Sequence, residues 1–319
     1  MPDVTIFGNA ILDVLVSPVD KSMFDNEATS VNRVKLSCGG DALNESTILS
    51  RLGKTVELIA KVGDDEAGVK VVEFLKQNGI DRSKIIVDST TDTSINLVMI
   101  KPNGDRFFLT DPSSSQRRLT EADVASRLEN SGSIIGFASM FVSSLLDIPA
   151  MEKLFKKIKS APGKILTVDM VQEKTGITLQ DLVPLLRYVD YFMPNNEEIA
   201  SLTGTKDILC NAELLIEAGC GCAIIKCGKD GCFIKTKAED HYIPAYPTCH
   251  CIDTTGAGDS FAAGFIWALS ERRDVVDCGC FASAVASCAI EQIGATDGVR
   301  SIETIFERYK TIKDSIKAR

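Results

Sequence analysis

Apolar runs of strand length alternate with amphipathic helical patterns along most of the chain. The runs predict strands over residues 4–7, 56–62, 134–137, 165–169, 191–193 and 223–226. The helical patterns cover residues 42–52, 66–77, 148–159, 179–187, 197–202 and 211–217, and three more fill the C-terminal third at 258–270, 275–291 and 302–317. Alternation of this kind is typical of an α/β fold, in which helices cover both faces of a mainly parallel sheet.

Two parts of the chain break the alternation. Residues 11–36 and 93–110 carry β-rich segments at 11–16, 31–36, 95–100 and 107–109 with no helix between them. Asn103-Gly104 is a hairpin signal between the last two segments. These segments predict a small separate sheet, although an antiparallel extension of the main sheet would give the same pattern. No internal repeat or low-complexity linker interrupts the chain, so we expect one domain over residues 1–319.

Composition narrows the class of protein. The 319 residues are 45% hydrophobic and 25% charged, which is ordinary for a soluble globular protein. The formal net charge is −9 and the pI is near 5.0, and basic residues cluster only in short runs such as 153–159, which fits the solvated face of a helix. We therefore expect no nucleic-acid partner. The chain opens on an apolar strand, and no apolar run approaches the length of a membrane span, so we expect a cytoplasmic protein without a membrane partner.

The cysteines and histidines limit the chemistry. The chain has 11 cysteines, some in C-x-C pairs, but no C-x-x-C or Cys/His zinc spacing. Cys249-His250-Cys251 is the one candidate for a metal site, whereas several other cysteines lie in apolar stretches and fit small hydrophobic residues of a reducing compartment. Only two histidines occur, which argues against Ser/His or Cys/His nucleophilic catalysis.

The most informative segment is residues 253–259, which read DTTGAGD and precede a helix rich in small residues. Glycines let a ligand approach the backbone closely, and the first N–H groups of a helix form an anion site. Gly256, Ala257 and Gly258 are therefore predicted to donate N–H groups to a transferring phosphoryl group, with Asp259 accepting the proton of the attacking hydroxyl. For an isolated G-x-G-D match, a glycine turn with an aspartate cap before a packed helix would be the better explanation.

This string resembles the C-terminal signature, D-T-x-G-A-G-D, of the ribokinase-like (PfkB) carbohydrate kinases. The resemblance implies that Asp259 is the catalytic base and that Gly256 to Gly258 form the anion hole. It also implies that Asp253 and Thr255 lie near the region that holds a monovalent cation such as K⁺, or a phosphate of ATP, in some members. The family fold is a mainly parallel sheet with helices on both faces and a small β-sheet lid.

The acceptor side of the chain carries a second signature. Gly39-Gly40, followed by Asp41 and Asn44, resembles the family's N-terminal G-G-x-x-x-N, which the family assigns to the substrate. Paired glycines before a helix also occur as a purely structural turn. Asp13 matches the family's acidic residue that holds two sugar hydroxyls, although an aspartate in a surface turn would look the same.

Two motifs between the signatures imply a site for ATP and Mg²⁺. Asn195 and Glu198 match the family's N-x-x-E, which arranges the Mg²⁺ waters and the ATP phosphates, and the same pair predicts a helix capping box. Lys226, Gly228 and Gly231 match K-x-G-x-x-G, which contacts the ATP phosphates and ribose in the family.

The β-rich segments match the family's lid, which covers the sugar and often forms the dimer contact, so we expect a homodimer through the lid. Lid closure suits a kinase because it excludes water that would otherwise take the phosphoryl group. Arg106 lies in the lid, where it either reaches an acidic or phosphorylated substrate or sits at a solvent-exposed edge.

Departures from ribokinase bear on the acceptor. Asp41 stands where ribokinase has a lysine, Ile11 where it has an asparagine, and residues 138–144 lack its sugar-binding glutamate. These departures weaken a ribose assignment and leave fructose-like sugars, other hexoses and nucleosides open. The sequence thus predicts an ATP-dependent kinase that phosphorylates a primary hydroxyl of a sugar, with a nucleoside kinase and a catalytically silent binding protein as alternatives.

Overall fold

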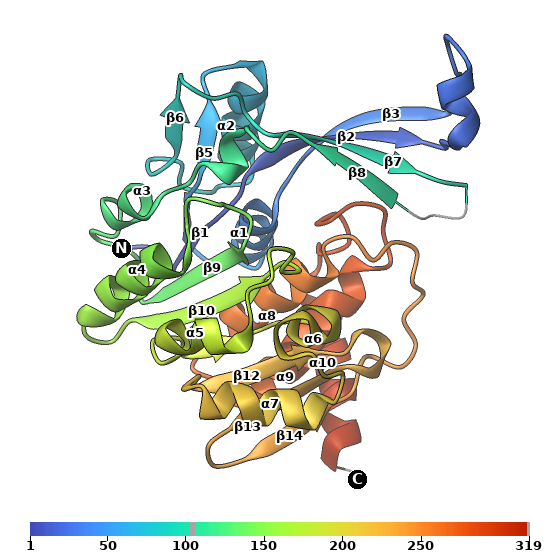
Figure 1. Cartoon of the computed structure of the whole chain (residues 1–319). Coiled ribbons are helices and arrows are strands. Elements are labelled where there is room, and N and C mark those ends of the chain that lie inside the picture. The colour runs from blue at the N-terminus through green and yellow to red at the C-terminus, as the bar shows by residue number, and fades with distance from the viewer. Residues whose placement is uncertain (103–105, 318–319) are drawn as a thin grey trace.

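An eight-stranded sheet forms the centre of the computed structural model, which describes residues 1–102 and 106–317 (Figure 1). The strands, in spatial order, are β14 (Asp240–Ile243), β13 (Cys232–Thr236), β12 (Cys222–Lys226), β11 (Tyr191–Phe192), β10 (Ile165–Met170), β9 (Ile134–Met140), β1 (Val4–Phe7) and β4 (Val56–Ile59). Neighbours from β4 to β12 pair in parallel, and β13 and β14 add an antiparallel edge. The predicted, mainly parallel sheet is confirmed.

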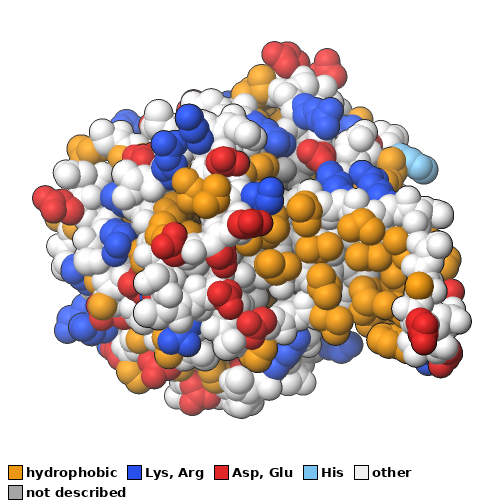
Figure 2. Space-filling model, turned by 90° about the horizontal axis from the view of Figure 1, so that it is seen from above, with side chains coloured by type: hydrophobic (Ala, Val, Ile, Leu, Met, Phe, Trp, Pro, Cys, Tyr) orange, Lys and Arg blue, Asp and Glu red, His pale blue; other side chains and the backbone are white. Residues whose placement is uncertain are grey.

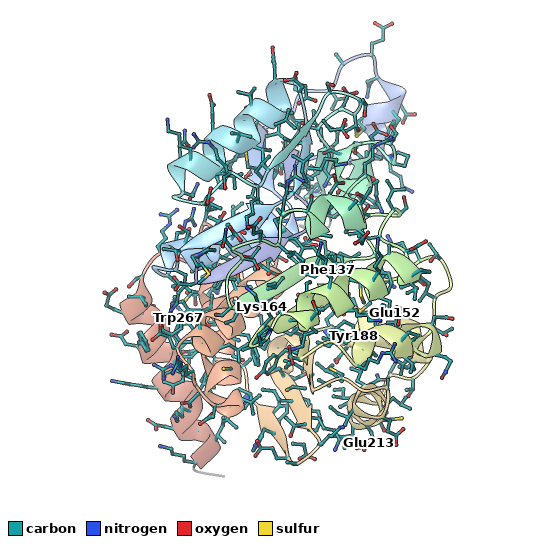
Figure 3. The ribbon with its side chains drawn as sticks, turned by 90° about the vertical axis from the view of Figure 1, so that its left-hand side faces the viewer. Phe137, Glu152, Lys164, Tyr188, Glu213 and Trp267 are labelled. Atoms are coloured by element: carbon teal, nitrogen blue, oxygen red, sulfur yellow. The ribbon has the colours of Figure 1, made fainter. Side chains whose placement is uncertain are left out.

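Helices cover both faces of this sheet, and a separate hydrophobic cluster fills each side. One layer holds α1 (Asp41–Arg51), α2 (Glu66–Gln77), α8 (Ala257–Ser270), α9 (Val275–Ala289) and α10 (Ile302–Lys317). The opposite layer holds α3 (Glu121–Ala125), α4 (Ile148–Ser160), α5 (Leu179–Leu186), α6 (Asn196–Thr203) and α7 (Ile208–Glu217). Trp267 belongs to the first cluster and Phe137 to the second, and Figure 3 shows Trp267 among α8 to α10.

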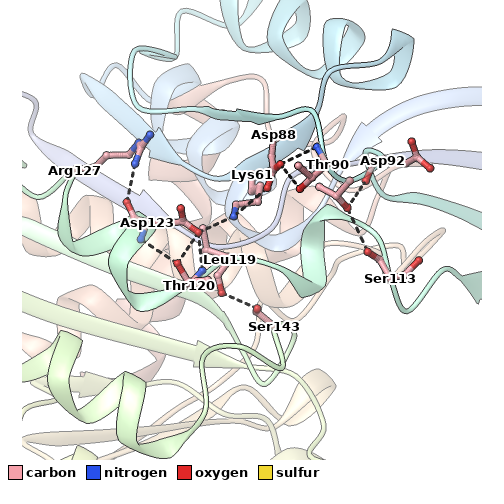
Figure 4. A network of polar contacts seen from close by, with 11 residues as sticks. Lys61, Asp88, Thr90, Asp92, Ser113, Leu119, Thr120, Asp123, Arg127 and Ser143 are labelled. Carbon is pink, nitrogen blue, oxygen red and sulfur yellow. Dashed lines mark hydrogen bonds and ion pairs between the residues drawn. The ribbon is translucent and has the colours of Figure 1, made fainter.

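One predicted strand is wrong in detail. The run at 56–62 splits at Ala60 into β4 and β5 (Lys61–Gly63), and β5 leaves the main sheet to pair with β6 (Ile86–Asp88). The split follows from Lys61, whose buried ammonium pairs with Asp123 at 2.8 Å and Asp88 at 3.5 Å (Figure 4). A charged side chain can be buried only where such partners lie, so β5 turns toward them.

The lid is a separate four-stranded sheet, as predicted, and not an extension of the main sheet. Its strand order is β3 (Arg33–Gly39), β2 (Ile11–Ser17), β7 (Ile95–Ile100) and β8 (Arg106–Thr110). The pair β2–β7 is parallel and the two outer pairs are antiparallel. The hairpin signal Asn103-Gly104 between β7 and β8 lies outside the described residues.

Hydroxyl groups join the two segments that flank the lid strands, where β7 begins and β8 ends. Ser94 Oγ donates to Ser114 Oγ (2.7 Å) and accepts from the Gln116 N–H (2.9 Å), and Thr91 Oγ1 donates to the Ser113 carbonyl (3.3 Å). Figure 4 shows Ser113 near the Lys61 network. Short 3₁₀ turns, which the sequence did not predict, occur at η1 (Lys21–Asp25), η2 (Ser115–Arg117) and η3 (Gly228–Asp230).

The two faces of the lid differ in polarity. The face turned away from the body carries Val34, Leu36, Leu97, Phe107 and Leu109, each between 40% and 63% exposed. Figure 2 shows a broad hydrophobic area on the molecule seen from above. A contiguous apolar surface of this kind is typical of an interaction site.

Within residues 1–102 and 106–317, none of the helices combines the length and hydrophobicity that crossing a bilayer requires.

Candidate active site

Three helix N-termini, those of α1, α6 and α8, meet the carboxyl ends of β10 and β12 at a cavity of about 800 Å³. Its lining includes Asp41, Asp169, Glu198, Lys226, Gly258 and Asp259. A second cavity of about 970 Å³ lies between the inner face of the lid and residues 251–256. Both cavities touch Cys251 and Thr254, so the loop that ends in α8 is a wall between them. Ligands of open α/β sheets bind at such strand ends.

The start of α8 has the geometry of an anion site. Gly256 caps the helix with φ of +70°, and a side chain there would collide with the Ala295 carbonyl, so only glycine fits. The first intrahelical bond runs from the Ser260 N–H to the Gly256 carbonyl (2.8 Å). The N–H groups of Gly258 and Asp259 precede that bond, so no helix carbonyl accepts from them, and that of Asp259 interacts with its own carboxylate. The N–H of Ala257 donates to the Thr254 carbonyl (3.2 Å), so the turn already engages it.

Asp259 accepts a hydrogen bond from Asn44, a residue of the N-terminal signature. The Asn44 amide donates to its carboxylate over 2.7 Å, and these residues are 215 positions apart. Burial raises the pKa of Asp259, and the Asn44 hydrogen bond and the Lys226 charge oppose that rise. The structure therefore joins the two predicted motifs at one carboxylate.

Lys226 and Asp169 form a buried ion pair that the sequence analysis missed. The Lys226 ammonium donates to both Asp169 oxygens, at 2.8 and 2.6 Å. Burial raises the pKa of Asp169 to about 7 against the opposing charge of Lys226, and the negative charge of Glu198 adds to the rise. The ammonium lies 3.4 Å from the position that a Cβ on Gly258 would take, beside the anion site. A carboxylate ending the buried run at 165–169 was the available signal.

Several carboxylates surround this single ammonium. Asp41 and Glu45 stand one turn apart on α1, and burial together with neighbouring carboxylates raises the pKa of each well above its usual range. Glu45, which the sequence analysis missed, is 1% exposed, and its Oε1 has no hydrogen-bond partner among the described residues. Such crowding of negative groups favours a cationic ligand near the cavity.

The residues present suit Mg²⁺ held mainly by phosphates and water. In the parts of the chain that are described, no three carboxylate, cysteine or histidine side chains converge closely enough to hold an ion directly. Glu198 forms the predicted capping box, because its Oε2 accepts from the Asn195 N–H (2.7 Å) while Asn195 Oδ1 accepts from the Glu198 N–H (2.9 Å). Its carboxylate lines the cavity, where it could meet a hydrated ion.

Glycines and apolar side chains form another part of the lining of the first cavity. Gly228 and Gly231, at the turn between β12 and β13, line it together with Tyr246, Pro247, Ala286 and Ile290. Thr255, predicted to contact ATP, lines the lid cavity instead, and Thr254 lines this one.

The residues predicted to bind the acceptor lie where the lid meets α1. Asp13 pairs in register with Asn96 on β7 and Ser37 on β3. Burial raises the pKa of Asp13 to about 6, against a hydrogen bond from Asn96 and the charge of Arg106. A side chain on Gly40, where φ is +97°, would collide with the Asn9 carbonyl, so packing requires glycine there. A side chain on Gly39 would displace the Asp13 carboxylate.

Asp253 makes contacts that do not suit a potassium ion. Its Oδ1 accepts from the Arg106 guanidinium and the Thr255 N–H (2.9 Å), and its Oδ2 accepts from the Gly294 N–H (2.9 Å). Burial alone would raise the pKa of Asp253, but these donors, Arg106 first, lower it. Because a guanidinium already neutralises the carboxylate, a second cation there would be repelled.

The chain resembles known proteins along most of its length. The profile of the pfkB family of carbohydrate kinases matches residues 1–302. An uncharacterized sugar kinase of Archaeoglobus fulgidus is 30% identical over 262 residues, which cover 80% of this chain and 99% of that protein. A nucleoside kinase of Methanothermobacter thermautotrophicus is 26% identical over 309 residues, 96% of this chain and 95% of that protein. A putative ribokinase II of E. coli, solved with ATP and Mg²⁺, has a TM-score of 0.79 at 21% identity and covers 97% of this chain and 100% of that one.

The chain therefore belongs to the pfkB family of carbohydrate kinases, and its fold is ribokinase-like.

Proposed function

We propose that this protein transfers the γ-phosphoryl group of ATP to a primary hydroxyl of a sugar, with Asp259 as the base. The hydrogen bond between Asn44 and Asp259 carries the proposal, because it joins an acceptor motif and an anion-site motif at one carboxylate that lines the first cavity. The first cavity would take ATP and the lid side the acceptor.

Each residue has a separate task in this reaction. Asn44 orients the Asp259 carboxylate, which takes the proton of the acceptor hydroxyl as the new bond to phosphorus forms. The N–H groups at the start of α8 and the Lys226 ammonium stabilise charge on the transferring phosphoryl group. A carboxylate base is adequate because the transition state of phosphoryl transfer is loose.

The nucleotide would bind through residues of the C-terminal half. Asn195, Lys226, Gly228 and Gly231 would contact ATP in the first cavity. Thr255 lines the lid cavity, so Thr254 would take its predicted place beside the phosphates. Mg²⁺ neutralises the phosphates when bound, and Glu198 would meet it through water.

The acceptor would be bound by Asp13, Gly39, Gly40 and Asn44, with Asp41 beside the base. A nucleoside is the second candidate acceptor, and a nucleoside kinase is among the similar proteins. The third candidate, a silent binding protein, is disfavoured because it would have no need of an oriented Asp259.

ADP release with MgATP tests the proposal across a panel of hexoses, pentoses and nucleosides. We expect turnover on a monosaccharide with a free primary hydroxyl. Turnover on nucleosides alone would support the second candidate. Turnover on no acceptor, with ATP binding intact by calorimetry, would support the silent binding protein.

The apolar outer face of the lid fits a contact between two copies of this chain, and we propose a homodimer there (Figure 2). Light scattering should give twice the 34.5 kDa chain mass, and Leu97→Glu should give monomers. A wild-type monomer at micromolar concentration would contradict the dimer. We also propose that residues 1–319 form one domain, which requires a single unfolding transition.

A further inference from the structure

The Arg106–Asp253 pair connects two parts of the molecule that belong to different sheets. Arg106 is the first residue of β8 in the lid, and Asp253 precedes the anion site by a few positions, 147 residues later in the chain. The Arg106 side chain is 19% exposed and the Asp253 side chain 5%. This contact is therefore sheltered from water, unlike the pair between Lys35 of β3 and Asp297, whose side chains are 38% and 40% exposed.

Asp253 needs a cation for its own burial and for the chemistry beside it. A buried carboxylate is costly unless it is paired and hydrogen-bonded. Its N–H donors at Thr255 and Gly294 fix its position but leave its negative charge. That charge lies beside the N–H groups that would meet a phosphoryl group, and the repulsion would be stronger there than in water.

The guanidinium of Arg106 supplies the missing positive charge. It contacts Oδ1 of Asp253 and is also near enough to Asp13 to lower the pKa of that carboxyl against the larger effect of burial. One lid side chain therefore acts on the acceptor carboxylate and on the loop that forms the anion site. Arginine stays charged at every working pH, so this neutralisation does not depend on titration.

We propose that Arg106 is a tethered monovalent cation, which stands in for a free alkali ion at Asp253 and completes the anion site when the lid is in place. Arg106 is a positioning residue, because it acts through Asp253 and the loop. The proposal rests on the proposed kinase reaction for its effect on rate. The contacts at Asp253 carry it, since the carboxylate already has three donors, one of them a full positive charge.

The first experiment measures the dependence of kcat on monovalent cations at constant ionic strength. Wild type should change less than about twofold when K⁺ replaces tetramethylammonium. Arg106→Ala should lose about tenfold in kcat in tetramethylammonium and recover saturably with K⁺ or with low concentrations of guanidinium. Arg106→Lys, which keeps the charge, should remain independent of K⁺.

Arg33→Gln is the matched control, because Arg33 lines the same lid cavity on the neighbouring strand β3. It should lower kcat less than twofold and gain no dependence on K⁺. Strong activation of the wild type by K⁺ would overturn the proposal. So would a loss in Arg106→Ala that no cation restores, or one confined to the KM of the acceptor.

A second readout is independent of turnover. K⁺ should raise the Tm of Arg106→Ala and leave the Tm of the wild type unchanged relative to tetramethylammonium. This result separates the two ideas: if no acceptor is turned over, the kinase proposal fails while the Tm series still decides the role of Arg106. Equal K⁺ effects on both proteins would contradict it.

Discussion

Asp253 and Asp259 lie at the two ends of one loop, and their environments shift the pKa values of the two carboxyl groups in opposite directions. Burial is the largest influence on the pKa of each carboxyl. Asp253 receives a guanidinium and two backbone N–H groups, which outweigh burial and lower its pKa. Asp259 receives the Asn44 hydrogen bond, the charge of Lys226 and its own backbone N–H, but burial outweighs them and its pKa is raised.

The difference shows how hydrogen-bond donors and nearby charges can give two identical side chains different protonation behaviour. A carboxylate that is fully paired stays charged and supports the loop. A carboxylate on which burial outweighs the donors keeps affinity for a proton, which a general base requires. Both residues are aspartates in the motif DTTGAGD, so the motif alone does not distinguish them. The difference comes from contacts with Asn44, Arg106, Lys226 and Gly294, which are distant in sequence.

The largest expected effect is on rate. Asp259→Asn should lower kcat by roughly 10²-fold or more, because an amide cannot take the proton of the acceptor. Asp253→Asn keeps the base and should cost about tenfold or less. Steady-state kinetics with the acceptor that gives the highest turnover measure both, and calorimetry of acceptor binding should show little change in Asp259→Asn. Equal losses in the two variants would abolish the distinction between the two carboxylates.

A smaller effect concerns pH. Asn44→Ala removes the donor that opposes the raised pKa of Asp259, so the pKa should rise further. The acid limb of the kcat/KM profile, which reports the deprotonated base, should then move to higher pH than in the wild type. An unchanged limb, with activity lowered equally at all pH values, would mean that Asn44 acts on the acceptor and not on the base.

The smallest effect concerns stability, and its sign differs between the variants. Asp253 has a lower pKa in the folded protein than in the unfolded chain, so its ionised form stabilises the fold at neutral pH. This stabilisation is lost as the pH falls through the pKa of the folded protein. Asp253→Asn should therefore reduce the free energy of unfolding at pH 7 by about 1–2 kcal/mol, and the difference should shrink at acid pH.

The raised pKa of Asp259 has the opposite consequence. Asp259 binds a proton more tightly in the folded protein than in the unfolded chain, so the protonated carboxyl stabilises the fold at low pH. This stabilisation is lost as the pH rises through the pKa of the folded protein. Asp259→Asn should raise the free energy of unfolding at pH 7 by about 1 kcal/mol. Urea unfolding at pH 7 and pH 4.5 checks both variants, and shifts of the same sign would contradict the comparison.

Much of the fold could be predicted because its signals are local. Strand–helix alternation gave the main sheet, and the helix-free segments gave the lid. The strand at 56–62 was misjudged because the partners of Lys61, which bend the chain, lie at Asp88 and Asp123. No local pattern reveals those partners.

In the candidate site, too, local motifs could be predicted from the sequence and long-range contacts could not. The proposed roles of Asp259 and Asn44 rest on motifs that are visible in short windows of sequence. The pairing of Asp169 with Lys226 spans 57 positions and that of Arg106 with Asp253 spans 147, so neither could be seen before the chain was folded. Glu45 escaped notice because a glutamate on a helix is ordinarily a surface residue.

The lid has a consequence for how this protein could acquire new substrates. Among the described residues, β7 and β8 contribute nothing to the two hydrophobic clusters of the main sheet. Substitutions on their inner face, at Asn96 for example, would change what the acceptor meets without weakening the core. Selection for a different acceptor can therefore act on these strands at little risk to folding, and libraries for directed evolution should begin there.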